Sequence, residues 1–366
     1  MRQRAKATIV SEGTTVSIVI PCLNEERFIA NCLDSILAND FPRHQMEVLV
    51  IDGGSEDRTR SIVDRYLVQH SVIRRIDNPR AITPVAFNLG ITHSRGDLVM
   101  LMSAHATLAS DAIRKCAEYS GLYGADNVGG IWKIYPRGQS GFDRAACFAL
   151  AHRFGVGGAL YRIPGQRQPR WVDTAAYGCY KRAVFDRIGM FNERLVHSQD
   201  IEFNLRLMRS GGRTLLAPDV VIRYFARTNF TSFFKHNFNN GVWVILPFLY
   251  SAAMPIRGRH LVPLIFVSSL VVLVALGAFG SLAWWLLTSV LLTYAICSVS
   301  AACQVASAQK DLRQLALMPI AFASLHVSYG LGSLWGLAKL CGNRTFWSKR
   351  LPQLVMTERV DKNPAH

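Results

Sequence analysis

Three nearly continuous apolar runs in the first hundred residues predict strands that are buried on both faces. The runs cover residues 16–20, 47–51 and 98–102 and are rich in branched apolar side chains. A strand with one solvated face alternates apolar and polar residues, whereas a strand of a parallel sheet is covered on both sides. Stretches of helical length separate the runs and imply right-handed crossovers. The pattern therefore predicts an α/β fold with a doubly wound, mostly parallel sheet.

From residue 261 onward the pattern changes to long apolar stretches with few charges. These stretches cover residues 261–280, 282–302 and 315–339. Each is close to the roughly 20 residues that a helix needs to cross a bilayer. A single stretch of this kind can be a core helix of a soluble protein, but three in sequence predict an α-helical membrane region. We expect a multi-pass protein of the inner (plasma) membrane.

An aromatic and amphipathic segment, residues 229–250, precedes the apolar stretches. Such a segment can lie in the bilayer interface, or it can pack on the preceding domain as core. The chain is thus predicted to have four parts, which are a first domain over 1–228, an amphipathic interfacial segment over 229–260, transmembrane helices over 261–340 and a basic tail over 341–366.

The formal net charge of +16 indicates an anionic partner. Arg and Lys are spread over the whole chain and form no basic stripe with interleaved aromatics, so the sequence does not favour nucleic acid. With three apolar stretches in the same chain, anionic membrane lipid is the simpler partner. The eight cysteines include no C-x-x-C pair and are predicted to be reduced packing residues.

The two ends of the chain give conflicting signals about topology. Basic residues at 1–6 are followed by no apolar segment, so no cleavable signal peptide is predicted and the first domain is expected in the cytoplasm. Three spans would then place the tail outside, yet its excess of basic residues is typical of the cytoplasmic side. Either the 315–339 stretch is re-entrant or residues 242–254 add a membrane element. We predict a cytoplasmic carboxyl terminus.

Short polar clusters follow each of the three predicted strands. They are Asn24-Glu25 after the strand that Pro21 ends, Asp52-Gly-Gly-Ser55 after the second strand, and Ser103-Ala-His105 after the third. Because ligands of open parallel sheets bind at the carboxyl ends of the strands, the clusters describe one site.

Ordinary helix capping is an alternative explanation for several of these polar residues. Glu25 can cap a helix that runs to about Leu37, because a helix amino terminus favours carboxylates. Ser55 or Asp57 can cap the next helix. Thr83 can be the cap of a third helix, in which Pro84 suits the first turn.

Two motifs, VSIVIPCLNEER at residues 16–27 and IDGGSEDRT at residues 51–59, resemble those of family 2 glycosyltransferases. Four further features resemble bacterial exopolysaccharide glycosyltransferases of the succinoglycan type. They are the Asn78-Pro-Arg-Ala81 run, the x-Ala-His sequence at residues 103–105, the Val172-Asp-Thr174 segment and the carboxyl-terminal apolar helices. The resemblance covers about residues 16–241. It implies a GT-A-type fold and an inverting enzyme whose donor is a UDP-sugar or a similar nucleotide sugar.

The resemblance also implies roles for individual residues. The aspartate at the Asp52 position hydrogen-bonds the base of the nucleotide, and the helix that holds the donor carries Asn88, with Arg80 in the loop before it. Asn88 alone can equally be a helix-face hydrogen-bonding residue. The remaining substrate-binding candidates are Pro21, Asn24, Glu25, Ser103 and Asp173.

The segment 197–206 is predicted to start a helix with an apolar stripe formed by Ile201, Leu205 and Met208. The resemblance implies that Asp200 is the catalytic base that deprotonates the acceptor hydroxyl; its ordinary alternative is a helix cap or first-turn acid. Glu202 stands two residues further on, so it cannot share a helix face with Asp200. Upstream, residues 171–182 are predicted to be a strand that leads into a helix ending near residue 188.

The Ser103-Ala104-His105 cluster departs from the pattern of family 2 glycosyltransferases as a whole. The family has a D-x-D motif there, whose carboxylates hold a divalent cation against the sugar diphosphate. In this chain His105 can be a metal ligand or an ordinary polar loop residue, and imidazole shifts the preference from Mg²⁺ toward Mn²⁺. Asp97 precedes its strand, so it is expected at the opposite end of the sheet.

These observations favour a membrane-anchored inverting glycosyltransferase whose acceptor is a saccharide on a polyprenyl diphosphate. A processive polysaccharide synthase is disfavoured, because Arg170-Trp171 precedes Asp200 and no glutamine stands three residues ahead of Arg170. A non-catalytic membrane scaffold that has lost its metal site is the alternative from a different class. The retained Asp52 and Asp200 argue against it.

Overall fold

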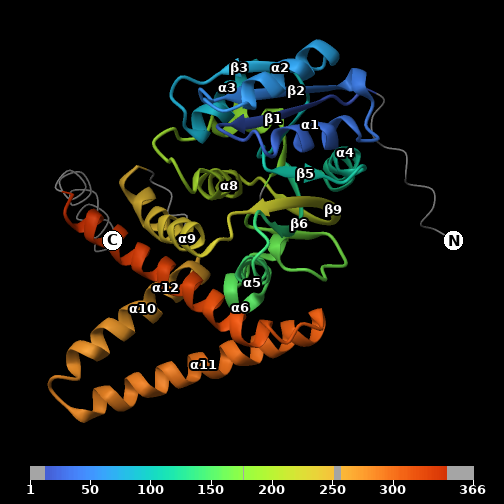
Figure 1. The fold of residues 1–366 in the computed structure, drawn as a ribbon. Helices are drawn as coiled ribbons and strands as arrows, with labels where there is room; N and C mark the ends of the chain where they lie inside the picture. Colours follow the sequence, from blue (N-terminus) through green and yellow to red (C-terminus); the bar gives the residue numbers. More distant parts are fainter. Residues whose placement is uncertain (1–12, 176, 251–256, 344–366) are drawn as a thin grey trace, which may run out of the picture.

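The computed structural model describes residues 13–175, 177–250 and 257–343. A sheet-based domain lies above a group of long helices, as Figure 1 shows. The predictions for the amino-terminal segment and for the basic tail concern residues that lie outside the described ranges.

The amino-terminal half of the sheet is parallel. Its strands are β1 (Val16–Cys22), β2 (Met46–Asp52), β3 (Ile73–Asp77) and β4 (Leu98–Leu101), in the order β3-β2-β1-β4. All three predicted strands are present. The first is longer than predicted, because Pro21 pairs with Ile51 within the strand and β1 continues to Cys22.

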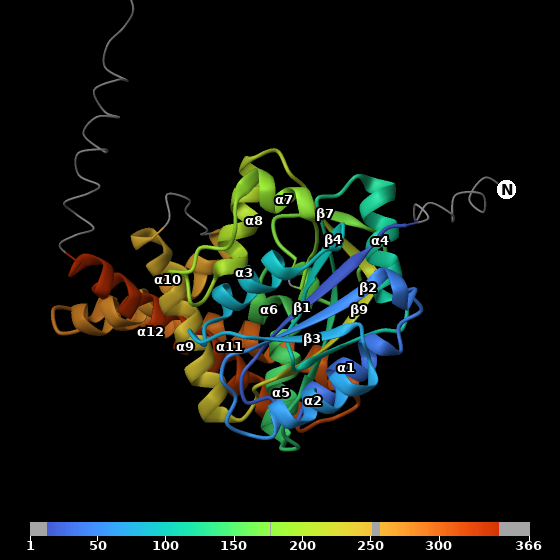
Figure 2. The same ribbon diagram turned by 90° about the horizontal axis from the view of Figure 1, so that it is seen from above.

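Helices cover both faces of this parallel half, which explains why its strands lack polar residues in alternation (Figure 2). Ile18 and Ile20 face α1 (Ile29–Leu37), α2 (Thr59–Gln69) and α4 (Ala112–Tyr123). Val19 and Leu49 face α3 (Thr83–His93), α7 (Arg182–Ile188) and α8 (Gln199–Arg209). Both sets of side chains are removed from water, so the hydrophobic effect fixes the helices on both sides.

The second half of the sheet is mixed. Its strands are β5 (Ala106–Leu108), β6 (Asn127–Pro136), β7 (Arg170–Val172), β8 (Cys179–Lys181) and β9 (Thr214–Ala226). β8 joins β4 and β6 in antiparallel pairs, β9 runs parallel to β6, and β5 and β7 pair antiparallel with β9. The α/β class is confirmed, and the parallel pairing is concentrated in the first half.

Several local details differ from the sequence predictions. The first helix begins at Ile29, several residues after Glu25, and the cap of α3 is Ile82, which makes Thr83 its first helical residue. The 171–182 segment forms the two short strands β7 and β8 before α7, which ends at Ile188 as predicted. In α8 the buried face consists of Glu202, Phe203, Asn204 and Leu207, whereas Met208 of the predicted stripe is exposed.

The remaining described elements are shorter than the long helices. They are η1 (Arg43–Gln45), α5 (Gly141–Leu150), α6 (Arg153–Val156), η2 (Leu160–Arg162), α9 (Phe230–Ile245) and η3 (Leu246–Leu249). α5 begins with a capping box in which Ser140 and Asp143 satisfy each other's backbone N–H groups. The Asp143 carboxylate also accepts a hydrogen bond from Thr228, which fixes the chain just before α9.

The long helices are α10 (Gly258–Leu276), α11 (Ser281–Gln309) and α12 (Gln314–Cys341). All three are long and apolar enough to cross a membrane. α10 and α11 extend away from the domain, whereas α12 runs beneath it beside α9 (Figure 1). Ala145 and Ala149 of α5 pack on Phe322 of α12.

The contact between α9 and α12 is very close. A Cβ added at Gly332 would lie 2.0 Å from the Phe238 carbonyl oxygen, and one added at Gly241 would lie 2.0 Å from the Tyr329 carbonyl oxygen. Two helix backbones approach this closely only where small residues face each other. The amphipathic segment predicted over 229–250 is therefore a helix and a 3₁₀ turn that pack on α12.

Candidate functional site

A cavity of about 500 Å³ lies where the carboxyl ends of β1 and β4 face α8 and α9, and we call it the first cavity. Of the ten residues proposed from the sequence as catalytic, substrate-binding or metal-binding, five line it. They are Pro21, Glu25, Ser103, His105 and Asp200. Asp97 lies at the other end of β4, where it accepts hydrogen bonds from Thr15, as its position in the sequence predicts.

Glu25 and His105 form a buried pair in this cavity. The Oε1 atom of Glu25 lies 2.7 Å from Nδ1 of His105, and the Ser103 hydroxyl lies 2.9 Å from the same ring nitrogen. The loop holds Glu25 in place, because the Thr59 hydroxyl accepts its backbone N–H at 2.8 Å. Burial lowers the pKa of His105 below its ordinary value, against the opposing effect of Glu25. A neutral imidazole next to a carboxylate is a donor set for a borderline metal ion.

Among the described residues, no group of three or more His, Cys, Asp and Glu side chains could hold a metal ion. In the first cavity the Glu25–His105 pair offers two such side chains. Magnesium sites commonly take one or two ligands from the protein and the rest from substrate phosphates. The Glu25–His105 pair therefore fits a cation whose coordination is completed by a bound diphosphate.

Asp200 is the second residue of α8 and lies on the wall of the first cavity. Burial raises its pKa above the ordinary value for an aspartate. Its backbone carbonyl accepts a hydrogen bond from Asn204, whose side chain also bonds Thr174 and Tyr180 inside the domain. This buried amide fixes the first turn of α8 and thereby the position of the carboxylate.

Glu202 points elsewhere, as the helix geometry predicts. It is only 2% exposed, and its carboxylate binds the Arg206 guanidinium at 2.8 Å. Arg206 also donates to the carbonyls of Ile188 and Met190, so the ion pair joins α8 to the end of α7. Its surroundings indicate a structural function for Glu202.

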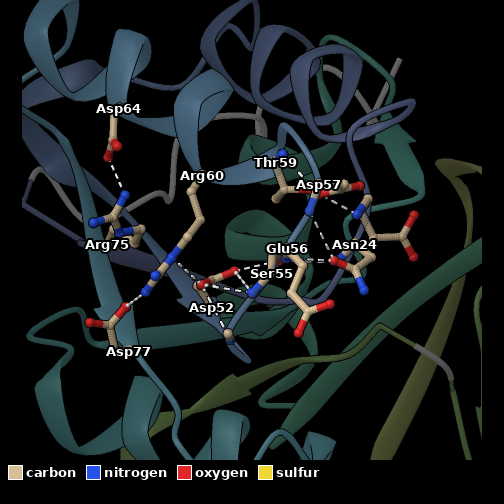
Figure 3. Close-up of polar contacts among 12 residues, drawn as sticks. Asn24, Asp52, Ser55, Glu56, Asp57, Thr59, Arg60, Asp64, Arg75 and Asp77 are labelled. Atoms are coloured by element: carbon tan, nitrogen blue, oxygen red, sulfur yellow. Dashed lines mark hydrogen bonds and ion pairs between the residues drawn. The ribbon is translucent and has the colours of Figure 1, made fainter.

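Asn24 and Asp52 organise the loop between β2 and α2, which Figure 3 shows in close-up. The Asp52 carboxylate accepts hydrogen bonds from the Ser55 hydroxyl and backbone N–H, and it pairs with Arg60 at 2.8 Å. Asn24, at a φ of 54°, accepts the Glu56 N–H through its side chain at 2.9 Å. Neither residue lines the first cavity, although the neighbouring Gly53 does.

Asn88 and Arg80 bind a loop of the domain itself. The Asn88 amide donates to the Phe191 carbonyl and to the Glu193 carboxylate, each at 3.0 Å, and its oxygen accepts the Phe191 N–H. Arg80 forms an ion pair with the same Glu193. Phe191 lines the first cavity, so these contacts hold part of its wall.

Asp173 lies outside the first cavity and contacts the start of α10. Its carboxylate pairs with Arg257 at 3.1 Å and with Arg259 at 3.0 Å. The two ion pairs connect the segment after β7 to the first of the long apolar helices.

The basic groups of the site were not among the candidates proposed from the sequence. Arg162, Arg227, His197 and His236 all line the first cavity. The Nε atom of Arg162 is buried without a hydrogen-bond partner among the described residues, and its guanidinium lies 5.3 Å from the Trp132 ring centroid. Burial lowers the pKa of His236 to about 4. These residues belong to no local motif, so only the fold brings them together.

Comparisons with known proteins bear on the domain as a whole. Residues 17–189 match the family model described as Glycosyl transferase family 2. Over 276 residues the chain is 28% identical to the succinoglycan biosynthesis protein ExoA of Rhizobium meliloti (strain 1021), covering 75% of this chain and 80% of that protein.

A second relative is the dolichyl N-acetyl-alpha-D-glucosaminyl phosphate 3-beta-D-2,3-diacetamido-2,3-dideoxy-beta-D-glucuronosyltransferase of Methanococcus voltae. It is 26% identical over 234 residues, which are 62% of this chain and 71% of that protein. Among solved structures, the mannosyltransferase PcManGT of Pyrobaculum calidifontis, in complex with GDP-Man and Mn²⁺, superposes with a TM-score of 0.57. That match covers 87% of each chain at 19% identity and so concerns the fold.

Proposed function

Because residues 17–189 match the glycosyl transferase family 2 model, we propose that this protein transfers a sugar from a nucleotide sugar to a lipid-linked saccharide, with inversion at the anomeric carbon. One observation carries the proposal: a carboxylate of raised pKa, Asp200, and the Glu25–His105 pair line the same cavity. The named activities of the relatives, in succinoglycan biosynthesis and on a dolichyl phosphate saccharide, support a role in cell-surface glycan synthesis.

The proposed reaction is a direct displacement. A hydroxyl oxygen of the acceptor attacks the anomeric carbon, and the bond from that carbon to the diphosphate oxygen breaks. The Asp200 carboxylate takes the hydroxyl proton, and the nucleoside diphosphate leaves. A base with a raised pKa holds this proton better than an ordinary aspartate would, which helps general-base catalysis near neutral pH.

Glu25 and His105 would hold a divalent cation, Mn²⁺ in preference to Mg²⁺ because one ligand is an imidazole. When bound, the cation would neutralise the negative charge of the diphosphate. Ser103 would orient the His105 ring through its hydroxyl, and Pro21 would shape the cavity floor. The Mn²⁺ bound with GDP-Man in the mannosyltransferase supports this proposal.

The other substrate-binding candidates would act by holding the loops around the nucleotide. Asn24 and Asp52 would keep the β2–α2 loop in shape, so that Gly53 can face the base. Arg80 and Asn88 would do the same for the 191–193 loop. Asp173 would fix the domain to α10 through Arg257 and Arg259.

We expect His105→Ala to lower turnover sharply and to abolish the advantage of Mn²⁺ over Mg²⁺. Removing the imidazole leaves Glu25 as the single protein ligand of the pair. The measurement is turnover in chelator with each metal added back, together with Mn²⁺ binding followed by electron paramagnetic resonance. His44→Ala, which changes an exposed histidine, is the control. Undiminished activity of His105→Ala in chelator would overturn the ligand role and direct attention to Arg162 and Arg227.

The proposed function is tested directly with membranes that contain the protein. A panel of radiolabelled nucleotide sugars is incubated with these membranes and a lipid extract, and transfer of label to the lipid fraction is measured. We expect transfer from one donor of the panel. Binding of a nucleotide sugar without transfer from any donor would instead support the non-catalytic scaffold.

The three long helices would anchor the protein in the plasma membrane, with the catalytic domain in the cytoplasm where nucleotide sugars are made. Anionic lipid would contact basic side chains near the helix ends.

A further inference from the structure

A second cavity, of about 570 Å³, lies between the domain and the long helices. The residues 153–162 of the domain form one side, and α10, α11 and α12 form the other. The two cavities have five lining residues in common, which are Arg162, Ser198, Asp200, Asn237 and Asn240. The residue placed as catalytic base therefore stands in the wall between them.

A hydrogen-bonded bridge fixes this side of the second cavity. The Tyr294 hydroxyl lies 2.9 Å from Nδ1 of His326, and Nε2 of the same ring lies 3.3 Å from the Gly155 carbonyl. The bridge connects α11 and α12 to the segment that carries Arg153. The cavity is consequently built by the fold, since the bridge holds α11 and α12 against the 153–162 segment.

The part of the second cavity near Asp200 is cationic. Arg153, Arg162 and Arg259 line it, and Arg259 is the one of the three that pairs with an acid, Asp173. Among the described residues no carboxylate forms an ion pair with Arg153 or Arg162, and the Nε atom of Arg162 is buried without a hydrogen-bond partner. A guanidinium with a buried, unused Nε–H favours an anion of phosphate geometry.

The part of the cavity along the long helices is apolar. Val262, Pro263 and Phe266 of α10 line it together with Leu325 of α12. Val262 is 62% exposed, so this wall is open toward the surface that a bilayer would cover. A hydrocarbon chain on this wall loses contact with water in the same way as a side chain in a core.

We propose that the second cavity is the acceptor site and that it takes the phosphate or diphosphate ester of a long apolar alcohol. Arg153 and Arg162 bind the phosphate group, and the chain runs along Val262 and Phe266. The saccharide then extends past Asp200 toward the donor in the first cavity. The acceptor role rests on the proposed function, whereas the binding of the lipid phosphate is tested by itself.

The test uses full-length protein in phosphatidylcholine nanodiscs and radiolabelled farnesyl diphosphate as the probe. Val262→Trp fills the apolar wall, and Arg153→Glu reverses a charge of the polar part. Each is expected to raise the dissociation constant of the probe by about tenfold or more. The controls are Val271→Trp, at an exposed site further along α10, and Arg65→Glu, at an exposed site on α2. Both controls are expected to leave the constant unchanged.

Equal binding of farnesyl diphosphate to Val262→Trp and Val271→Trp would overturn the proposal. Displacement of the probe by dioleoylphosphatidylglycerol as readily as by unlabelled farnesyl diphosphate would also overturn it, because the site would then be one for membrane phospholipid. Binding of UDP and GDP is measured in parallel. If no nucleotide binds and no sugar is transferred while the probe shows the expected pattern, the proposed function fails and the lipid-phosphate site stands. If nucleotides bind and the probe does not, the second cavity alone is wrongly assigned.

Discussion

Asp200→Asn is expected to lower turnover by a factor of about 10² to 10⁴ while leaving nucleotide affinity unchanged. Sugar hydroxyls are poor nucleophiles at neutral pH, so the displacement needs a positioned base. Asparagine keeps the size and hydrogen-bonding reach of the side chain but cannot accept the proton. The measurement is turnover together with the dissociation constant of the nucleoside diphosphate, for the wild type and the variant.

The pH profile gives an independent check of the same group. The base works only when it is ionised, and burial raises the pKa of Asp200. As the pH decreases, kcat/KM should therefore begin to fall at a pH above roughly 3.9, which is the ordinary pKa of an aspartate. This acid limb should be absent from the residual activity of Asp200→Asn. Its persistence there would assign the limb to another group.

Glu202→Gln is the matched control on the same helix. Its carboxylate is buried against Arg206, away from the cavity, so the substitution should lower stability more than turnover. Near-normal turnover in Asp200→Asn would remove Asp200 as the base.

Gly332→Leu is expected to lower the free energy of unfolding by about 3 kcal/mol or more. This is at the upper end of the destabilisation that overpacking usually causes. The added Cβ would lie 2.0 Å from the Phe238 carbonyl oxygen, and a backbone group of α9 cannot move aside as a side-chain end can. Thermal unfolding in detergent measures the effect, and we expect turnover to fall with it because α9 also lines the first cavity.

Gly258→Leu is the control for this substitution. An added Cβ at Gly258, the first residue of α10, meets no atom of the described residues within 4 Å. The variant should unfold at nearly the wild-type temperature. Equal destabilisation by both substitutions would mean that the close α9–α12 contact is not the reason why Gly332→Leu lowers the stability.

The sequence predicted the parallel half of the sheet because strands buried on both faces leave a continuous apolar signal. It also placed Asp200 and Glu202 on different sides of a helix from spacing alone. The prediction of the buried stripe of α8 was wrong. Phe203 is packed under α7, whereas Met208 is exposed. The spacing of apolar residues cannot distinguish two overlapping apolar faces of a helix. The start of α1 was misplaced because the side chains of Asn24 and Glu25 are used in loop contacts and do not cap the helix.

The basic side of the site was not predictable from local patterns. Arg162 and His236 lie far apart in the sequence and in no motif, and they meet because α9 returns beneath the sheet after β9. The same holds for Asp173, whose partners Arg257 and Arg259 precede a helix that the sequence marks only by its apolar composition. Such contacts depend on tertiary packing, which one sequence without an alignment does not record.

The packing of α12 under the domain has a practical consequence for anyone who expresses the protein in parts. Cutting the chain after residue 250 would remove the surface that covers Ala145, Ala149 and Phe233, and it would leave the apolar face of α9 in water. A truncated fragment that keeps every residue of the first cavity should therefore aggregate or require detergent. A soluble fragment would have to keep α9 and α12 together, because they cover each other. Sequence hydropathy alone does not show this, since it separates α9 from the long apolar helices.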